Sequence, residues 1–287
     1  MRYAKPTSAA EASALLAGET GVTRVLAGGT DVLVQMKAGM VEPDLVVDIK
    51  AIPGIRDILA EAGGFRVGAA VAGAELKAHA GLRAMWPGVV EAANLIGSTQ
   101  VQGRCTMAGN LCNASPAADS VPALVAADAA ARVQGPNGTR DVPVLAVPAG
   151  PGKTTLAKGE FITSIFLPAR PANASDAYLR FIPRTEMDIA VASAGVSLVL
   201  DGSGKVTSAR VALGAVAPTV RLVEAAAAAI VGTRLDEAAL TALAAAASAA
   251  CSPIDDKRGT VQFRTHVAGV LARRAAIIAL NRAGGMK

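Results

Sequence analysis

The 287-residue sequence has few of the residues that build disulfide scaffolds and metal sites. It contains three cysteines, Cys105, Cys112 and Cys251, and two histidines, His79 and His266. Three cysteines cannot all pair with one another, and their spacing fits no common zinc or iron–sulfur pattern. Neither histidine has a second ligand at metal-binding spacing. We therefore expect a reducing compartment, no metal site, and surface or capping roles for both histidines.

Aromatic residues, basic runs and long apolar runs are also scarce. Aromatics make up 3% of the residues, and the net charge of +5 includes no Lys/Arg run. This composition argues against a nucleic-acid-binding protein. The richest apolar stretch, residues 235–251, is interrupted by acidic and hydroxyl residues, and the N-terminus lacks the pattern of a signal peptide. We expect a cytoplasmic protein without a membrane span.

The length of the chain predicts two or three packed units rather than one. Apolar periodicity predicts helices, strands and hairpins in a mixed order. The predicted helices cover 8–17, 74–80, 87–95, 116–126, 220–231, 236–250 and 261–281, the predicted strands 23–26, 45–49 and 161–167, and the predicted hairpins 129–144 and 190–216. A stretch rich in proline, alanine, asparagine and serine, residues 168–175, is the best candidate boundary between units.

A first glycine loop, Ala27-Gly28-Gly29-Thr30-Asp31, joins the predicted strand at 23–26 to a turn or two of helix. Backbone N–H groups at such a junction can hold an anion, and two adjacent glycines let a pyrophosphate approach the chain. The loop is not the G-x-G-x-x-G of the Rossmann fold. Ordinary strand-to-helix turns also use Gly-Gly, so the loop alone leaves phosphate binding and a structural turn open.

A second loop, residues 96–119, is long, polar and built from small residues, and we expect no regular element in it. Thr106, Asn110, Asn113, Ser115 and Asp119 supply hydrogen-bond donors and acceptors within a short span. Long loops with this composition usually hold a ligand. The sequence therefore predicts a binding site at this loop.

Other candidate motifs predict no site. Gly150-Pro151-Gly152-Lys153-Thr154 resembles the end of a P-loop, but Val147 stands where the first glycine is required, which excludes ATP binding there. The charged stretches 184–188 and 255–258 are typical of solvated turns. No Ser-His-Asp arrangement can be assembled.

Taken together, the two loops and Leu213-Gly214-Ala215-Val216-Ala217-Pro218 resemble the FAD-binding medium subunit of molybdenum hydroxylases, the xanthine dehydrogenase and carbon monoxide dehydrogenase family. The likeness covers nearly the whole chain, with the blocks in the same order and at the same spacing. It implies an α+β chain with a two-part FAD-binding domain of the vanillyl-alcohol-oxidase type, subdomains 1–54 and 55–174. A smaller C-terminal domain of the CO dehydrogenase flavoprotein type, 175–287, would follow, with a sheet covered by helices.

The resemblance also implies which residues meet the cofactor. The first loop would wrap the FAD pyrophosphate, and Asp119 would hydrogen-bond to ribityl or sugar hydroxyls. The implied FAD-binding residues are Leu26, Ala27, Gly28, Gly29, Thr30, Asp31, Ile96, Gly97, Thr106, Gly109, Asn110, Cys112, Asn113, Asp119, Ile162 and Arg180. Ala108 departs from the family pattern, which has a second glycine there, and we expect a small shift of the backbone. The chain lacks the cysteine-bearing insertion of some relatives, so it should hold flavin only.

In such complexes a large subunit carries a molybdenum cofactor and a small subunit carries two [2Fe-2S] clusters. The resemblance implies that this chain takes electrons from the small subunit and delivers them to NAD, oxygen or a quinone, in a dimer of heterotrimers. It implies no catalytic acid or base here, and the substrate is encoded in another chain.

Two alternatives are a stand-alone FAD oxidase or reductase on the same scaffold and a non-enzymatic assembly subunit. Sparse aromatics argue against the first, and the small polar residues around Asn110 against the second.

Overall fold

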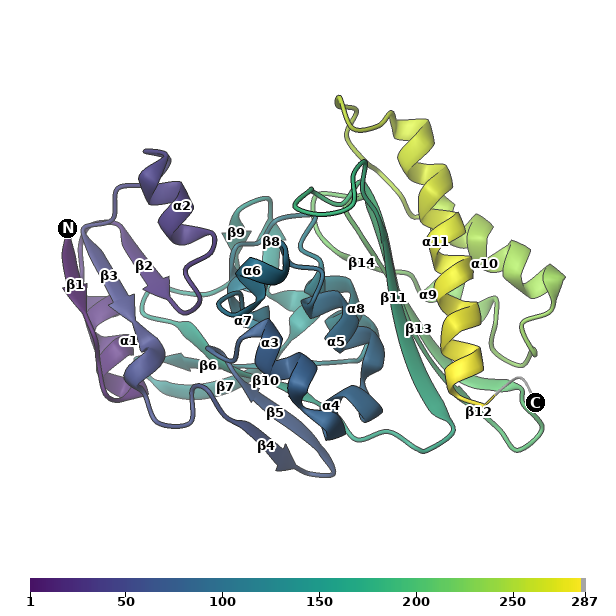
Figure 1. The fold of residues 1–287 in the computed structure, drawn as a ribbon, viewed down its shortest axis with the longest axis horizontal. Helices are drawn as coiled ribbons and strands as arrows, with labels where there is room; N and C mark the ends of the chain where they lie inside the picture. The colour runs from purple at the N-terminus through teal and green to yellow at the C-terminus, as the bar shows by residue number, and fades with distance from the viewer. Residues whose placement is uncertain (285–287) are drawn as a thin grey trace.

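The computed structural model describes residues 1–284, which form three principal sheets arranged along the molecule (Figure 1). The N-terminal sheet is parallel, with the strand order β1-β3-β2. Its elements are β1 Arg2–Ala4, α1 Ala9–Gly18, β2 Thr23–Leu26, α2 Val32–Lys37 and β3 Leu45–Asp48. Every residue of the central strand β3 is buried, as expected for a parallel strand covered on both faces. Ser8 caps α1 by accepting a hydrogen bond from the N–H of Glu11, which confirms the predicted start of this helix.

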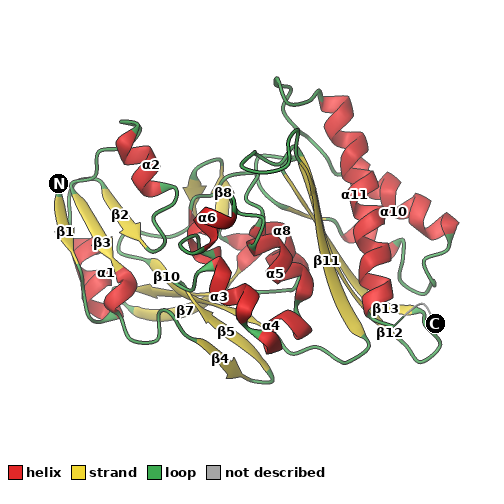
Figure 2. Cartoon of the chain, in the orientation of Figure 1, coloured by secondary structure: helices red, strands yellow, loops and turns green. Residues whose placement is uncertain are grey.

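The middle sheet is antiparallel, with the order β4-β5-β10-β6-β7. Its strands are β4 Ile58–Glu61, β5 Gly64–Gly68, β6 Ala130–Gly135, β7 Gly138–Pro143 and β10 Phe161–Leu167. The predicted hairpin over 129–144 is confirmed as β6 and β7, and the predicted strand over 161–167 as β10. Short helices lie between this sheet and the C-terminal sheet, among them α3 Gly73–Ala78, α4 Ala80–Met85, α5 Pro87–Ala93 and α8 Ser120–Ala126 (Figure 2).

The C-terminal sheet is antiparallel and is covered by helices on both faces (Figure 1). Its strands are β11 Ala174–Phe181, β12 Ala192–Leu200, β13 Val206–Gly214 and β14 Arg221–Leu222. Helices α9 Glu224–Ala228, α10 Glu237–Ala249 and α11 Val261–Arg282 form the outer layer, while α5 and α8 pack on the inner face. Burial on both faces explains why β12 consists mostly of small and apolar residues.

The second loop contains short helices, which corrects the expectation of an irregular segment. They are α6 Thr99–Gln102 and α7 Met107–Cys112. The Thr106 side chain caps α7 by accepting from the N–H of Gly109 at 3.0 Å, and Met107 and Leu111 are buried. In α7, capping and burial outweigh the weak helix propensity of glycine and asparagine.

Two predicted helices are shorter than expected. Helix α8 begins at Ser120 and not at Pro116, because the carbonyl of Pro116 accepts from the N–H of Ala215 in the C-terminal domain. The predicted helix over 220–231 starts late, since Arg221 and Leu222 first pair with β13 as strand β14. Both helices lose their predicted first residues because those residues pair with segments that are distant in the sequence or belong to a sheet.

Small elements complete the chain. They are η1 Ile49–Ala51, η2 Val144–Ala146 and the two-stranded hairpin β8 Pro148–Gly150 and β9 Lys153–Thr154. Within residues 1–284, no helix is both long and apolar enough to cross a bilayer.

Candidate functional site

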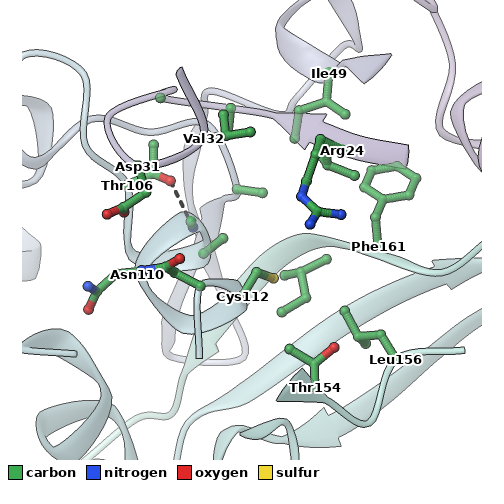
Figure 3. Close-up of a pocket in the computed structure, with 18 of the residues that line it drawn as sticks. Arg24, Asp31, Val32, Ile49, Thr106, Asn110, Cys112, Thr154, Leu156 and Phe161 are labelled. Atoms are coloured by element: carbon green, nitrogen blue, oxygen red, sulfur yellow. Dashed lines mark hydrogen bonds between the residues drawn. The ribbon is translucent and has the colours of Figure 1, made fainter. Parts of the chain in front are cut away.

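A cavity of about 690 Å³ lies where the N-terminal sheet, the second loop and the start of β10 meet (Figure 3). This volume is within the range of small-molecule and cofactor sites. Its walls combine the first glycine loop, the capped helix α7, the β9 hairpin and the segment that leads into β10. Loops far apart in sequence therefore build one site.

The first glycine loop forms one wall, and its two glycines are required for different reasons. A Cβ on Gly28 would lie 2.0 Å from the carbonyl oxygen of Arg104, so the first loop presses directly on the backbone of the second. Gly29 has a φ of +84°, a left-handed conformation that side chains disfavour. Only glycine satisfies both positions without strain.

The N–H groups of the first loop remain available for a ligand. Among the described residues, the backbone N–H groups of Gly28, Gly29, Thr30 and Asp31 donate no hydrogen bond to the protein. All four residues line the cavity. A run of free N–H groups with little side-chain bulk is the arrangement that holds a phosphate group. The residues present therefore fit a cofactor with a pyrophosphate.

The buried carboxylate of Asp48 fixes the first loop through Lys50. Lys50 donates from Nζ to the carbonyl of Ala27 at 3.2 Å and pairs with Asp48 at 2.8 Å. Tyr3 donates to the other carboxylate oxygen of Asp48 at 2.5 Å. Burial of Asp48 acts to raise its pKa, but the hydrogen bonds from Lys50 and Tyr3 outweigh it and hold the pKa below the usual value. The anionic carboxylate thus anchors the lysine that positions the loop.

The second loop is held by hydrogen bonds to both of its neighbours. Asn110 accepts with Oδ1 from the N–H of Ser120 at 3.1 Å and from its hydroxyl at 2.7 Å, which joins α7 to the start of α8. Gln35 donates to Oδ1 of Asn113 at 3.1 Å, which joins α2, the helix after the first loop, to the second loop. These bonds fix the cavity walls relative to each other.

Asp119 lies in a buried network next to this wall. Its carboxylate accepts from the hydroxyl of Tyr178 at 3.0 Å and from Nη1 of Arg180 at 2.6 Å, and both partners belong to β11. Burial raises the pKa of Asp119 to about 6, although Arg180 and Tyr178 act to lower it. The network connects the second loop to the C-terminal sheet.

Most of the sequence-predicted site residues share the cavity wall. Those that line it are Ala27, Gly28, Gly29, Thr30, Asp31, Ile96, Thr106, Gly109, Asn110, Cys112, Asn113 and Ile162. The other four do not line it. Leu26 lies next to Gly29, Gly97 is next to Val101, and Asp119 and Arg180 pair with each other. The contacts of all these residues with FAD stay a prediction.

The structure adds residues that the sequence did not reveal. Arg24, Thr154, Leu156 and Phe161 also line the cavity (Figure 3). Arg24 is only three positions before Ala27, and Thr154 belongs to the P-loop-like motif, so both had a local signal. Leu156 and Phe161 carried none, because only the folded chain brings the approach to β10 beside the first loop.

Two cysteines, Cys105 and Cys112, line this cavity, and Cys112 is the one that the resemblance places at the cofactor. Although it is exposed, the surrounding walls crowd its thiol, and this burial raises its pKa to about 12. A neutral thiol is a weak nucleophile, which disfavours a covalent bond to a cofactor.

The remaining candidates have structural roles. His79 accepts with Nδ1 from the N–H of Leu82 and caps α4, as predicted. Asp256 of the predicted charged turn pairs with Arg264 of α11, with Oδ1 and Nη2 2.6 Å apart. No cluster of three or more potential metal ligands occurs in the part of the chain that the structure describes.

Comparison with known proteins identifies the family. Residues 1–170 match the FAD binding domain in molybdopterin dehydrogenase, and residues 177–279 match the CO dehydrogenase flavoprotein C-terminal domain. The carbon monoxide dehydrogenase medium chain of Hydrogenophaga pseudoflava is 33% identical over 274 residues, 95% of this chain and 94% of that protein. The putative xanthine dehydrogenase FAD-binding subunit of Escherichia coli is 30% identical over 285 residues, 99% of this chain and 97% of that protein.

Solved structures agree over the same extent. Reconstituted CO dehydrogenase from Oligotropha carboxidovorans superposes with a TM-score of 0.93 at 34% identity, covering 98% of each chain. The two family models cover most of this chain, and the chain covers at least 94% of each of these relatives. This chain belongs to the family of FAD-binding medium subunits of the molybdenum hydroxylases, the family of carbon monoxide dehydrogenase and xanthine dehydrogenase.

Proposed function

We propose that this chain is the electron-transfer subunit of a heterotrimeric molybdenum hydroxylase. It would receive electrons from an iron–sulfur subunit with two [2Fe-2S] clusters and deliver them to NAD, oxygen or a quinone. Three free cysteines support a reducing location, the cytoplasm. The observation that carries the proposal is the cavity itself, where the first loop supplies free N–H donors and the second loop forms the facing wall from small residues.

The residues of this chain would bind and orient the cofactor and would not act as an acid or base. The N–H groups from Gly28 to Asp31 would hold the pyrophosphate, with Lys50 keeping the loop in place. Ile96 and Ile162 would exclude water beside the flavin. When bound, FAD accepts electrons singly and releases them as a pair, which suits a link between one-electron clusters and a two-electron acceptor.

Asp119 and Arg180 would set the electrostatics at the flavin end. Arg180 is a buried cation, with 6% of its side chain exposed, and it would donate to the polar edge of the ring. Asp119 would accept from a cofactor hydroxyl if its bonds to Tyr178 and Arg180 rearranged on binding. We propose that Asp119 and Arg180 contact FAD, as do the predicted residues that line the cavity.

The test is whether electrons reach this chain from a partner. We would purify the complex through a tag on this chain and expect one molybdenum-containing and one iron–sulfur chain in equal amounts with it. Mixing the FAD-loaded chain with the chemically reduced iron–sulfur chain should bleach the flavin absorbance. A chain that purifies alone and whose flavin is reduced directly by a small substrate would contradict the proposal and favour a stand-alone flavoenzyme.

A further inference from the structure

One end of the cavity is formed by Arg24 and apolar residues that the predicted FAD contacts do not include. Ile49 and Phe161 line this end together with Arg24, and Leu16 and Val25 also line the cavity. In Figure 3, Arg24, Ile49 and Phe161 lie on one side of the cavity, and Thr106 and Asn110 lie on the opposite side. An apolar slot with one polar group is typical of a site for a flat ring.

The opposite end of the cavity adjoins the C-terminal sheet. Asn110 is bonded to Ser120, and the preceding residue, Asp119, pairs with Arg180 of β11. If the first glycine loop holds the pyrophosphate between the two ends, the two halves of FAD extend in opposite directions. With the flavin at the Asn110 end, as proposed above, the adenosine half must occupy the Arg24 end.

Arg24 has unused binding capacity. Its guanidinium donates to the carbonyl of Thr23 at 2.8 Å, and within residues 1–284 it forms no ion pair. The residue is half-buried and lines the cavity. A guanidinium has five N–H donors and a flat face that stacks on aromatic rings. One local hydrogen bond leaves most of these donors and the face free.

We infer that Arg24 binds the adenosine half of FAD and makes the site select FAD over FMN. Adenine offers ring-nitrogen acceptors and a flat π-surface, and it would lie between the guanidinium and the apolar wall that includes Phe161. This inference rests on the proposed function, because it assumes that the cavity holds FAD. It adds a specificity residue to a site whose other contacts involve the pyrophosphate and the flavin.

The test compares the affinities of Arg24→Met and wild type for FAD and FMN, measured on the full chain by quenching of flavin fluorescence. FMN carries the flavin and one phosphate but no adenosine. We expect Arg24→Met to weaken FAD binding about tenfold and to leave FMN binding unchanged. ADP should likewise displace FAD about tenfold less well from the variant than from wild type. Arg24→Lys should restore only part of the loss, since an ammonium group stacks less well than a guanidinium.

Arg83→Met is the matched control. Arg83 is exposed on α4, also donates to a single backbone carbonyl, and lies outside the cavity wall. It should leave both flavin affinities unchanged, and the thermal unfolding of both variants without FAD should match wild type. If Arg24→Met binds FAD and FMN as wild type does, or weakens both equally, the inference is wrong. If wild type takes up no FAD, the proposed function itself fails.

Discussion

Gly28 marks the point where the two loops of the site touch, and substitution there should separate them. In Gly28→Ala the new methyl group meets the carbonyl of Arg104, which cannot move without shifting the second loop. We expect a loss of about 1–3 kcal/mol in the free energy of unfolding and at least tenfold weaker FAD binding. Chemical denaturation and FAD titration measure these effects.

Gly103→Ala provides the comparison in the same loop. A Cβ at Gly103 has no atom within 4 Å, and its φ of −69° suits any residue. This variant should bind FAD and unfold as wild type does. Equal losses in both variants would contradict the account, because only a Cβ at Gly28 meets the other loop and replacing glycine by alanine at a compatible position does not destabilise through the unfolded chain.

Asp119 gives the site a pH dependence. Its pKa is about 6 in the folded chain, against an ordinary value of 3.8, so the folded state binds more protons between these values. The free energy of unfolding should therefore fall as the pH rises from about 4 to 6, by up to about 3 kcal/mol, and this contribution should stay constant above pH 6. Asp119→Asn should lack this slope. Parallel pH profiles of the FAD-free wild type and variant would contradict the assignment.

At the residue scale, sequence reasoning found positions with a local signal. Gly28 and Gly29 stood out because a double glycine between a strand and a helix lets a pyrophosphate approach the chain, although ordinary turns use the same pair. Phe161 gave no signal, because buried aromatics in strands are common and nothing nearby in the sequence points to the cavity. Asp119 was predicted as a cofactor contact, while its pairing with Arg180 became visible only in the folded chain.

At the scale of elements, Asn110 joins α7 to α8, two short helices whose residues have no strong helix propensity. Asn110→Ala removes the acceptor that satisfies the N–H and hydroxyl of Ser120 at the start of α8. We expect the free energy of unfolding to fall by about 1–2 kcal/mol, because a helix cap is lost. Asn110→Asp keeps an acceptor and should retain this stability, but its added charge in the cavity should weaken FAD binding. If Asn110→Asp lost as much stability as Asn110→Ala, the cap would not be the cause.

Elements with a strong apolar period were predictable, and those made by tertiary contact were not. The hairpin over β12 and β13 and the long helix α11 follow from their own sequences. By contrast, α7 depends on a threonine cap and on burial against α8 and β10. Strand β14 forms only because β13 offers a free edge.

For the whole molecule, the joint between the FAD-binding part and the C-terminal sheet depends on a buried ion pair. Arg170 lies over the ring of Trp86 at 4.4 Å and pairs with Asp176 at 2.9 Å, and Asp176 also accepts from the N–H of Val89 in α5. Removing the cation leaves a buried carboxylate without its partner. Arg170→Met should therefore lower the free energy of unfolding by about 3 kcal/mol.

An exposed pair serves as the control for this prediction. Arg56 and Glu75 are 3.1 Å apart, with 55% and 44% of their side chains exposed. Arg56→Met should cost less than about 1 kcal/mol. Adding Asp176→Asn to Arg170→Met should recover part of the loss, since no buried charge then remains unpaired. If Arg170→Met and Arg56→Met lowered the free energy of unfolding by equally small amounts in denaturant titrations, the Arg170–Asp176 pair would not stabilise the joint.

The order of elements along the whole chain could be predicted because the motifs were spread over its full length. The division into 1–54, 55–174 and 175–287 stays a prediction, although each range contains one of the three principal sheets or most of it. The packing of α5 and α8 against the C-terminal sheet could not be predicted, because their apolar residues do not indicate which of two sheets they cover.

The central claim is that this chain holds FAD in the cavity between its two loops. The most direct measurement is the visible absorption spectrum of the purified full chain, followed by acid release of the chromophore and determination of its mass. The account predicts a flavin spectrum, release without a covalent bond, and the mass of FAD. A colourless chain that takes up no added FAD, even together with its partner subunits, would contradict it.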